Sequence, residues 1–254
     1  MKRDTVLRRS LLAEFLGSAF LAAVVIGSGI AAQRLSPGNV GLELFENAAA
    51  TAAGLYTIIL MFGPVSGAHF NPVVSLVDAS FGGLSWRRAF AYIPAQVAGC
   101  IAGAIAANGM FAEAAASVST KHRATGAHLL AEVIATLGLL LVIFSLARTS
   151  RAGSAPAAVG AYIGAAYFFT SSTSFANPAI DVGRTFSNTF AGIAPASVPG
   201  YAIAQLVGAL LAIGVLRTLY PDVSPADAAD VIVPHPDGRA SHSDLAPSQV
   251  GGHR

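Results

Sequence analysis

Two Asn-Pro dipeptides, Asn71-Pro72 and Asn177-Pro178, are the residues of this chain whose type and position could do chemistry. Each follows a polar stretch rich in Gly or Ser and opens a short amphipathic run. Asn is favoured as the N-cap of a helix and Pro as its first residue, so each asparagine is predicted to cap a helix. The side-chain oxygen would accept the capping hydrogen bond, and the NH2 group would stay free to donate to a passing oxygen atom.

The two helices that these caps begin are predicted over Pro72–Phe81 and Pro178–Phe190. Ten helical residues rise about 15 Å, which is half the thickness of the hydrocarbon core of a bilayer. Two such half-helices entering from opposite faces would meet at the midplane and together make one span. Each helix N-terminus carries roughly half a positive charge, so the meeting point would repel cations and admit neutral solutes.

The stretches that precede the caps are predicted to be extended, with their carbonyl groups exposed. Irregular backbone at membrane depth is tolerated only inside protein or along a water-filled cavity. The carbonyls would therefore form a ladder of acceptors along a path. The residues predicted to supply this backbone are Gly67, Ala68, His69 and Thr173. For the His69 side chain, a fixed hydrogen bond in the pore wall is favoured over a role as a pH sensor.

The composition is that of an integral membrane protein. Only 11% of the 254 residues are charged, against about 25% in a soluble domain, and the mean hydropathy is +0.62. The formal charge of +2 argues against nucleic acid as a partner. The single cysteine, Cys100, excludes an intrachain disulfide and a Cys-based metal site, and it is predicted to be a packing residue.

Six apolar stretches approach the length of about 20 residues that a bilayer requires. They are Leu11–Ala32, Leu44–Gly63, Ala89–Gly109, His128–Ala147, Ala155–Thr173 and Val198–Leu219. With a cytoplasmic N-terminus, the basic residues inside are Lys2, Arg3, Arg8, Arg9, Arg87, Arg88, Arg148, Arg151 and Arg217, and those outside are Arg34, Lys121, Arg123 and Arg184. The positive-inside rule therefore predicts a multi-pass protein of the cell membrane with both termini cytoplasmic. Residues 220–254, rich in Pro, Asp, Ser and Ala, are predicted to be a disordered cytoplasmic tail.

The two halves of the chain repeat each other, over about residues 8–110 and 126–219. Leu11-Leu12-Ala13-Glu14 matches Leu129-Leu130-Ala131-Glu132, and Tyr92-Ile93-Pro94-Ala95-Gln96 matches Tyr201-Ala202-Ile203-Ala204-Gln205. Each half holds three spans, an odd number, so the halves must insert with opposite orientation. Such inverted repeats build a path along their interface. The predicted fold is an all-α membrane protein, over residues 1–219, with six transmembrane helices and two re-entrant half-helices in an inverted 3+3 repeat.

Glu14 and Glu132 occupy equivalent places inside the first and fourth spans, where a charge is costly and usually functional. One interpretation is a proton relay in an ion-coupled transporter. The other is a structural acceptor for backbone N–H groups of the half-helix loops, which the symmetry favours. The spans contain no Ser-His-Asp set and no His-rich metal motif, so no catalytic residue, cofactor or metal is predicted.

Three motifs resemble those of the aquaporin and glycerol-facilitator family, the major intrinsic proteins: Ala13-Glu14-Phe15-Leu16-Gly17, Ser66-Gly67-Ala68-His69-Phe70-Asn71-Pro72-Val73 and Asn177-Pro178-Ala179. The resemblance covers nearly all of residues 8–219. It implies pore motifs formed by Asn71, Pro72, Val73, Asn177, Pro178 and Ala179, and structural roles for Glu14 and Glu132. It further implies a channel rather than an enzyme, assembled in the bilayer as a homotetramer with one pore per subunit.

The chain departs from the family at the outer filter, where the family usually has Arg three residues after the second Asn. Ile180 stands there, and Arg184 follows one helical turn nearer the outer mouth, where it could guard the entrance or bind Asp181 or a loop carbonyl. The family's spacing implies a selectivity filter of Thr51, Ala165, Ser174 and Ile180. This set has no aromatic ring and no cation, which implies a wide constriction. A slip in the fifth span would bring Tyr167 or Phe168 there instead and narrow it.

The resulting hypothesis is a passive channel of the permissive bacterial type. Its solutes would be glycerol, water and neutral metalloid hydroxides such as arsenous acid, and protons and ions would be excluded. Phe190–Pro195 resembles bacterial members linked to arsenic handling, and Asp181 resembles glycerol facilitators. The first alternative is a water-selective aquaporin, against which Ile180 argues. The second is a proton-coupled transporter that uses Glu14 and Glu132.

Overall fold

The chain is helical through most of the part that the computed structural model describes, residues 2–221. The long helices are α1 (Lys2–Leu35), α2 (Val40–Ser66), α4 (Trp86–Met110), α5 (Gly126–Arg148), α6 (Ala155–Phe169) and α8 (Val198–Leu219). Two short helices, α3 (Pro72–Phe81) and α7 (Pro178–Arg184), follow the Asn-Pro motifs, and 3-10 turns η1 (Ala152–Ser154) and η2 (Pro195–Ser197) precede α6 and α8. Apart from Tyr220 and Pro221, the predicted tail lies outside the described residues.

Five of the six predicted spans lie in helices that are long and apolar enough to cross a bilayer, namely α1, α2, α4, α5 and α8. The remaining predicted span, Ala155–Thr173, is too long, because α6 ends at Phe169 after 15 residues. A helix of that length rises about 22 Å, less than the thickness of the hydrocarbon core. The polar run from Thr170 to Ser174 leaves the helix and leads into α7, since hydroxyl side chains compete for the backbone groups that a helix needs.

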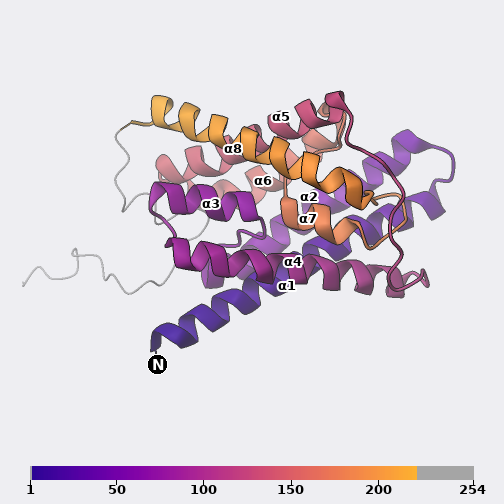
Figure 1. Ribbon diagram of the computed structural model, residues 1–254, viewed down its shortest axis with the longest axis horizontal. Helices are drawn as coiled ribbons and strands as arrows, with labels where there is room; N and C mark the ends of the chain where they lie inside the picture. Colours follow the sequence, from indigo (N-terminus) through magenta and orange to yellow (C-terminus); the bar gives the residue numbers. More distant parts are fainter. Residues whose placement is uncertain (1, 222–254) are drawn as a thin grey trace, which may run out of the picture.

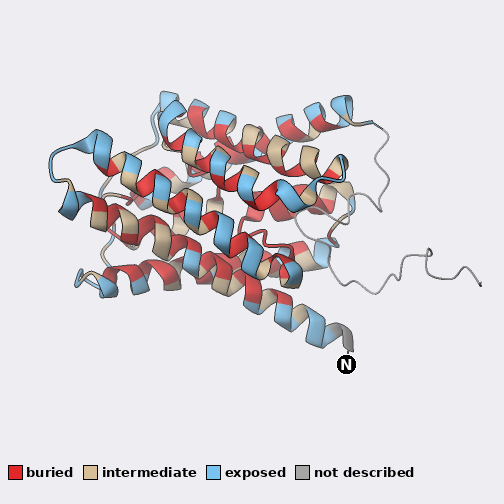
Figure 2. Cartoon of the chain, turned by 180° about the vertical axis from the view of Figure 1, so that it is seen from behind, coloured by how far each residue is buried: buried red, intermediate tan, exposed pale blue. Residues whose placement is uncertain are grey.

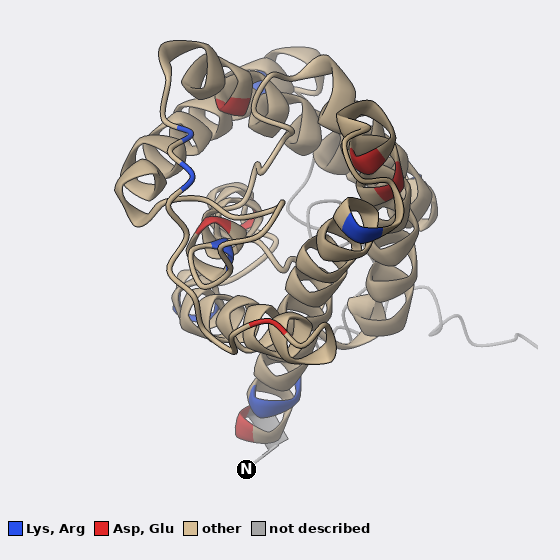
Figure 3. Ribbon diagram, turned by 90° about the vertical axis from the view of Figure 1, so that its right-hand side faces the viewer, with Lys and Arg blue, Asp and Glu red and all other residues tan. Residues whose placement is uncertain are grey.

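The long helices stand side by side and form a ring, seen end-on in Figure 3 and from the side in Figure 1. The start of α1 and the end of α8 lie on one side of this ring, which we call the terminal side (Figure 1). The loops 111–125 and 185–197 lie on the opposite side, which we call the loop side. Charged residues are sparse along the ring in Figure 3, as a bilayer requires.

The helix contacts follow the predicted repeat. In the first half α1 packs against α2 and α4, and in the second half α5 packs against α6 and α8. Across the halves, α2 packs against α6, α7 lies on α4, and α3 contacts α8. Each short helix is therefore shared between the two halves, which is how two intertwined three-helix repeats of opposite orientation enclose a path.

The second half-helix is shorter than predicted. It ends at Arg184 instead of Phe190, whereas α3 has its predicted bounds. The side chains that follow make bonds elsewhere: Ser187 Oγ donates to Asn108 Oδ1 at 2.7 Å, and Asn188 Oδ1 accepts from the backbone N–H of Thr120 at 3.1 Å. These bonds hold residues 185–194 as a loop against the end of α4 and loop 111–125, and a helix through the same residues would break them.

Glycines allow the closest approach of helices inside each half. A Cβ at Gly99 of α4 would press on the carbonyl oxygen of Phe15 in α1, and one at Gly208 of α8 would lie 2.6 Å from the carbonyl oxygen of Val133 in α5. These two glycines occupy equivalent places in the repeat. The hydrophobic effect does not drive association between helices in lipid. Close van der Waals packing does, and small residues at such crossings permit it.

The outward faces of the ring are apolar. Large side chains such as Phe20, Leu130 and Leu210 are exposed, although the chain is folded. Figure 2 shows exposed residues along the outer faces of the long helices and buried residues toward the interior. This distribution fits a protein surrounded by lipid, where an apolar surface has no cost.

Candidate functional site

The two Asn-Pro motifs meet in the middle of the ring. Asn71 Oδ1 accepts the backbone N–H of Val73 at 3.0 Å, and Asn177 Oδ1 accepts those of Ala179 and Ile180 at 3.0 and 3.3 Å, so both asparagines cap their helices as predicted. Each amide also reaches the opposite half: Asn71 Nδ2 donates to the carbonyl of Ala176, and Asn177 Nδ2 to that of Phe70, both at 2.7 Å. The prediction of a wholly free NH2 group is therefore corrected. One of its two N–H donors locks the two halves together, and the other is left for a solute.

The backbone before each cap is not extended throughout. Ala68 and Phe70 in the first loop, and Thr173, Ser174 and Ala176 in the second, have φ between 46° and 64°, in the left-handed region. Side chains with a Cβ rarely adopt this conformation, so the surrounding structure must hold it. The sequence did not indicate these conformations, because Gly67 is the only glycine in the stretches 67–70 and 173–176.

Glu14 holds the first loop from behind. Its Oε1 accepts Ser66 Oγ at 2.6 Å and the backbone N–H of His69 at 3.0 Å. Its Oε2 accepts the backbone N–H of Phe70 and Gln96 Nε2, both at 2.8 Å. A fully buried carboxylate with four donors is a geometry that matches the structural alternative for this residue.

Glu132 holds the second loop in the same way. Its Oε1 accepts the backbone N–H of Phe175 at 2.9 Å, and its Oε2 accepts that of Ala176 and Gln205 Nε2, both at 2.7 Å. Tandem N–H groups clamped by a carboxylate compensate the left-handed backbone conformations of these loops.

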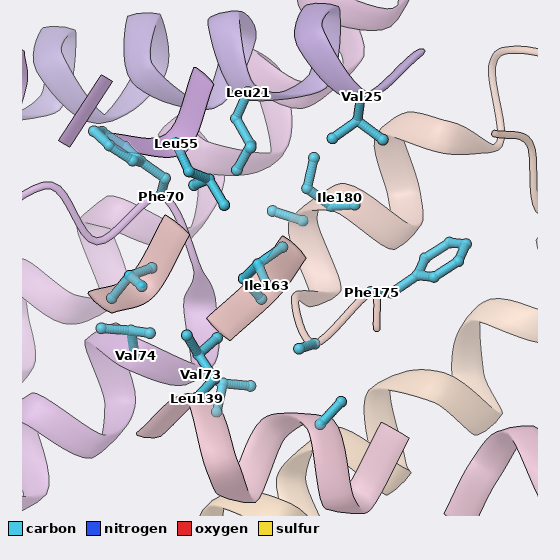
Figure 4. Close-up of a cluster of buried hydrophobic side chains, with 14 of the residues drawn as sticks. Leu21, Val25, Leu55, Phe70, Val73, Val74, Leu139, Ile163, Phe175 and Ile180 are labelled. Carbon is cyan, nitrogen blue, oxygen red and sulfur yellow. The ribbon is translucent and has the colours of Figure 1, made fainter. Parts of the chain in front are cut away.

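A cavity of about 60 Å³, counted as room for the centres of water-sized spheres, runs between the half-helices. One water needs about 10–15 Å³ on this scale, so the cavity holds roughly four waters. Its polar lining comprises Thr51, His69, Asn71, Tyr167, Ser174, Asn177 and Arg184. The rest is largely aliphatic, and Figure 4 shows Leu55, Val74, Ile163 and Ile180 among the buried side chains that converge here from several elements.

Other members of the pore motifs lie beside the cavity rather than in its wall. Ala68 lines the cavity, whereas Gly67 and Thr173, which precede the lining stretches, do not. The four residues that begin the half-helices, Pro72, Val73, Pro178 and Ala179, also do not line it. They act by starting α3 and α7 at the right place. The His69 side chain has the predicted fixed hydrogen bond, between Nδ1 and Ser75 Oγ, which lie 3.0 Å apart.

Three of the four predicted filter residues, Thr51, Ser174 and Ile180, line the cavity, but Ala165 does not. Ala165 is exposed on the outer face of α6, because successive helical residues are 100° apart and Ile163 and Tyr167 share the inner face. The Tyr167 hydroxyl lies 3.1 Å from Thr51 Oγ1. The wall therefore contains an aromatic ring, contrary to the prediction from Ala165, while Phe168 is exposed.

Arg184 reaches the same cavity as Ile180, from one turn further along α7. Its Nε donates to the carbonyl of Ala191, and its guanidinium carbon lies 3.4 Å from the ring centroid of Phe175. The residue thus binds a loop carbonyl, which is one of the roles that its position allowed, and its side chain also lines the cavity. The four predicted filter residues contain no cation, but the side chain of Arg184 places one in the wall of the same cavity.

Two further cations on the loop side were predicted only as topology signals. Arg123 donates from Nε to the carbonyl of Gly192 at 2.8 Å, and its guanidinium carbon lies 5.4 Å from the Phe175 ring. Burial, together with the charges of Arg123 and Arg184, lowers the pKa of Lys121. The sequence contained a signal for a role of these residues. Lys121 and Arg123 lie close together on the side that the positive-inside rule expects to be poor in Lys and Arg.

The capped N-termini of the two half-helices meet inside a ring of transmembrane helices. They lie beside a narrow cavity with an aliphatic and a polar wall. This arrangement defines a membrane channel. Residues 1–189 match the family described as Major intrinsic protein. The chain belongs to that family, whose members are channels and not enzymes.

Named relatives agree with this assignment. The chain is 46% identical to Aquaglyceroporin AqpS of Rhizobium meliloti (strain 1021) over 219 residues, covering 86% of this chain and 93% of that protein. It is 31% identical to the Lens fiber major intrinsic protein of Homo sapiens over 169 residues, covering 63% and 62%. Its fold matches the X-ray structure of the aquaglyceroporin from Plasmodium falciparum with a TM-score of 0.65 at 22% identity, over 85% of this chain and 98% of that one.

Proposed function

We propose that this protein is a passive channel for small uncharged solutes, namely glycerol, water and neutral metalloid hydroxides such as arsenous acid. The observation that carries the proposal is the two-sided wall of the cavity. Aliphatic side chains such as Ile163 and Ile180 suit the carbon atoms of a polyol, and the Asn71 and Asn177 amides with Arg184 offer donors to its hydroxyl oxygens. The 46% identity to a protein named as an aquaglyceroporin supports the same solute class.

Cations are repelled by this arrangement. The N-termini of α3 and α7 both point at the middle of the cavity, and Arg184 adds a full positive charge in its wall. Pores of this type are known to exclude cations by half-helix dipoles and an arginine. A proton-coupled transporter would need acids that exchange protons during transport, whereas the oxygens of Glu14 and Glu132 are taken up by backbone N–H groups of the two half-helix loops.

A water-selective channel is the second candidate, and one observation favours it. Tyr167, bonded to Thr51, and Arg184 both narrow the path more than the sequence predicted. Ile180 acts in the opposite sense, because it replaces the long side chain that the family usually has at this position with a short one. We infer that glycerol still passes.

The membrane orientation and assembly belong to the same proposal. The terminal side faces the cytoplasm, as the distribution of Lys and Arg predicts, and the chain forms a homotetramer with one pore per subunit. The exposed apolar faces of the ring are available for both lipid and neighbouring subunits.

Stopped-flow light scattering on proteoliposomes tests the solute class. Vesicles first shrink in a hyperosmotic gradient, and those containing the channel should then reswell rapidly with glycerol but stay shrunken with sucrose. Fast shrinkage with no reswelling above that of empty liposomes would establish the water-selective candidate instead.

A further inference from the structure

The first half-helix carries an acidic residue at the position that corresponds to Arg184. Asp78 lies seven residues after Asn71, as Arg184 lies seven residues after Asn177. Asp78 lies one helical turn after Val74, and Arg184 lies one turn after Ile180. Val74 and Ile180 are aliphatic and line the cavity, so each charged residue lies on the cavity-facing side of its helix. Arg184 reaches the cavity toward the loop side, whereas Asp78 is fully buried toward the terminal side.

Asp78 is held in an unfavourable environment. Both of its carboxylate oxygens are buried and, among the described residues, accept no hydrogen bond. It also lies in the last turn of α3, where the helix dipole disfavours a negative charge. Two basic groups lie near it: His69 Nε2 is 3.4 Å from Asp78 Oδ2 and forms an ion pair with it only when protonated, and the positive charge of Arg148 acts on the carboxylate from the end of α5.

Arg148 covers two aromatic rings just beyond the cavity on the terminal side. Its guanidinium carbon lies 3.9 Å from the ring centroid of Phe81 and 5.7 Å from that of Phe144, and the two centroids are 5.6 Å apart. Phe81 lies on the same face of α3 as Val74, two turns later, and Phe144 follows the cavity-lining Ile143. The three side chains therefore lie beside one another, next to the cavity-lining parts of α3 and α5.

We propose that Phe81, Phe144 and Arg148 form a gate at the terminal end of the pore and that the charge of Asp78 holds Arg148 in the closed position. The gate rests on the proposed channel function. While Asp78 is ionised and His69 is neutral, Arg148 is drawn inward over the rings. A proton taken up by His69 or Asp78 cancels the net charge of this pair, and Arg148 is then free to leave.

Other charged and titratable groups lie around this pair. Glu14 of α1 connects to it through Gln96 Nε2, which donates to both Glu14 Oε2 and Ser75 Oγ. The Tyr92 ring of α4 lies 5.7 Å from that of His69. Arg217 of α8 lies 5.9 Å from the Phe81 ring and adds a positive charge that also favours departure of Arg148.

The test measures glycerol reswelling and osmotic water flow of the wild type at internal pH values of about 8 and about 5.5, a range in which His titrates. Both fluxes of the wild type should rise roughly threefold on acidification. Asp78→Asn and Arg148→Gln should give the high flux at both pH values. Arg151→Gln, which removes an exposed arginine three residues away, should keep the wild-type profile.

A wild-type flux that is high and equal at both pH values would overturn the gate, as would wild-type pH profiles in both Asp78→Asn and Arg148→Gln. If Asp78→Asn fails to fold, Arg148→Gln and Phe81→Ala still test the gate, because both residues are only half-buried. Each of these two variants should raise the flux at pH 8. Failure of the proposed solute class looks different: the water flux would depend on pH, but no variant would pass glycerol.

Discussion

At the scale of single residues, the cation and the aromatic ring in the filter come from other backbone positions than the family's spacing implies. Ile180 occupies the position where the family usually has an arginine, and Arg184 sends its guanidinium into the same cavity from the next turn. Tyr167 lines the cavity in place of Ala165, the residue that the spacing had assigned to the filter, and so supplies an aromatic ring. The wall of the path therefore contains a cation and a ring together with an aliphatic side chain.

Restoring an arginine at position 180 should close the path to glycerol. Ile180→Arg adds a longer side chain and a second positive charge beside buried Arg184. We expect glycerol reswelling to fall about tenfold, with a smaller loss of water flow, measured in proteoliposomes of equal protein content. Ile180→Val, which removes one methylene and no charge, is the control; equal glycerol flux in both variants would contradict the assignment of Ile180 to the constriction.

Removing the ring of Tyr167 should widen the path. Tyr167→Ala should raise glycerol flow more than water flow, because the larger solute is limited more strongly by the width of the constriction. Tyr167→Phe loses only the hydroxyl group that lies 3.1 Å from Thr51 Oγ1 and should leave the glycerol flux within about twofold. An unchanged ratio of glycerol to water flow in Tyr167→Ala would show that another residue sets the width.

The membrane acids give a prediction that separates a channel from a transporter. Glu132→Gln replaces a charged acceptor of the Phe175 and Ala176 N–H groups with a neutral one and should destabilise the fold by about 1–3 kcal/mol. A lower midpoint of thermal unfolding in detergent should accompany a normal glycerol flux per folded channel. Unchanged stability with abolished flux would instead identify Glu132 as a proton carrier.

At the scale of elements, the sequence predicts where the half-helices begin better than where they end. Asn71-Pro72 and Asn177-Pro178 are local signals, because cap and first turn lie within a few residues. The end of α7 depends on the bonds of Ser187 to Asn108 in α4 and of Asn188 to Thr120 in loop 111–125, which no local pattern encodes. The rotation of α6 was also not predictable, since its residues are apolar on every face and so show no helical period.

The glycine crossings give a prediction about these elements. Gly99→Ala places a Cβ against the α1 backbone at Phe15 and should lower the midpoint of thermal unfolding, because overpacking costs about 1–3 kcal/mol. Gly109→Ala on the same helix has no atom within 4 Å of the new Cβ and should leave the midpoint unchanged or raise it. Equal effects of the two substitutions would mean that α1 and α4 can separate at no cost.

At the scale of the whole molecule, two halves of opposite orientation place corresponding residues at opposite ends of one path. The caps and the clamping acids are alike in both halves, as the repeated motifs predicted. The ends differ, because the terminal side has Asp78 where the loop side has Arg184. The symmetric part could be predicted from the sequence, while the difference between the ends became visible only when distant helices brought His69, Asp78 and Arg148 together.

The central claim is that this molecule conducts neutral solutes passively and excludes protons. The most direct test records glycerol-driven reswelling of proteoliposomes together with the fluorescence of an enclosed pH indicator, while a proton gradient is imposed and then removed. The account predicts that reswelling persists after the gradient is removed and that the internal pH does not move with the solute. Reswelling that stops with the gradient, or that carries protons inward, would contradict it.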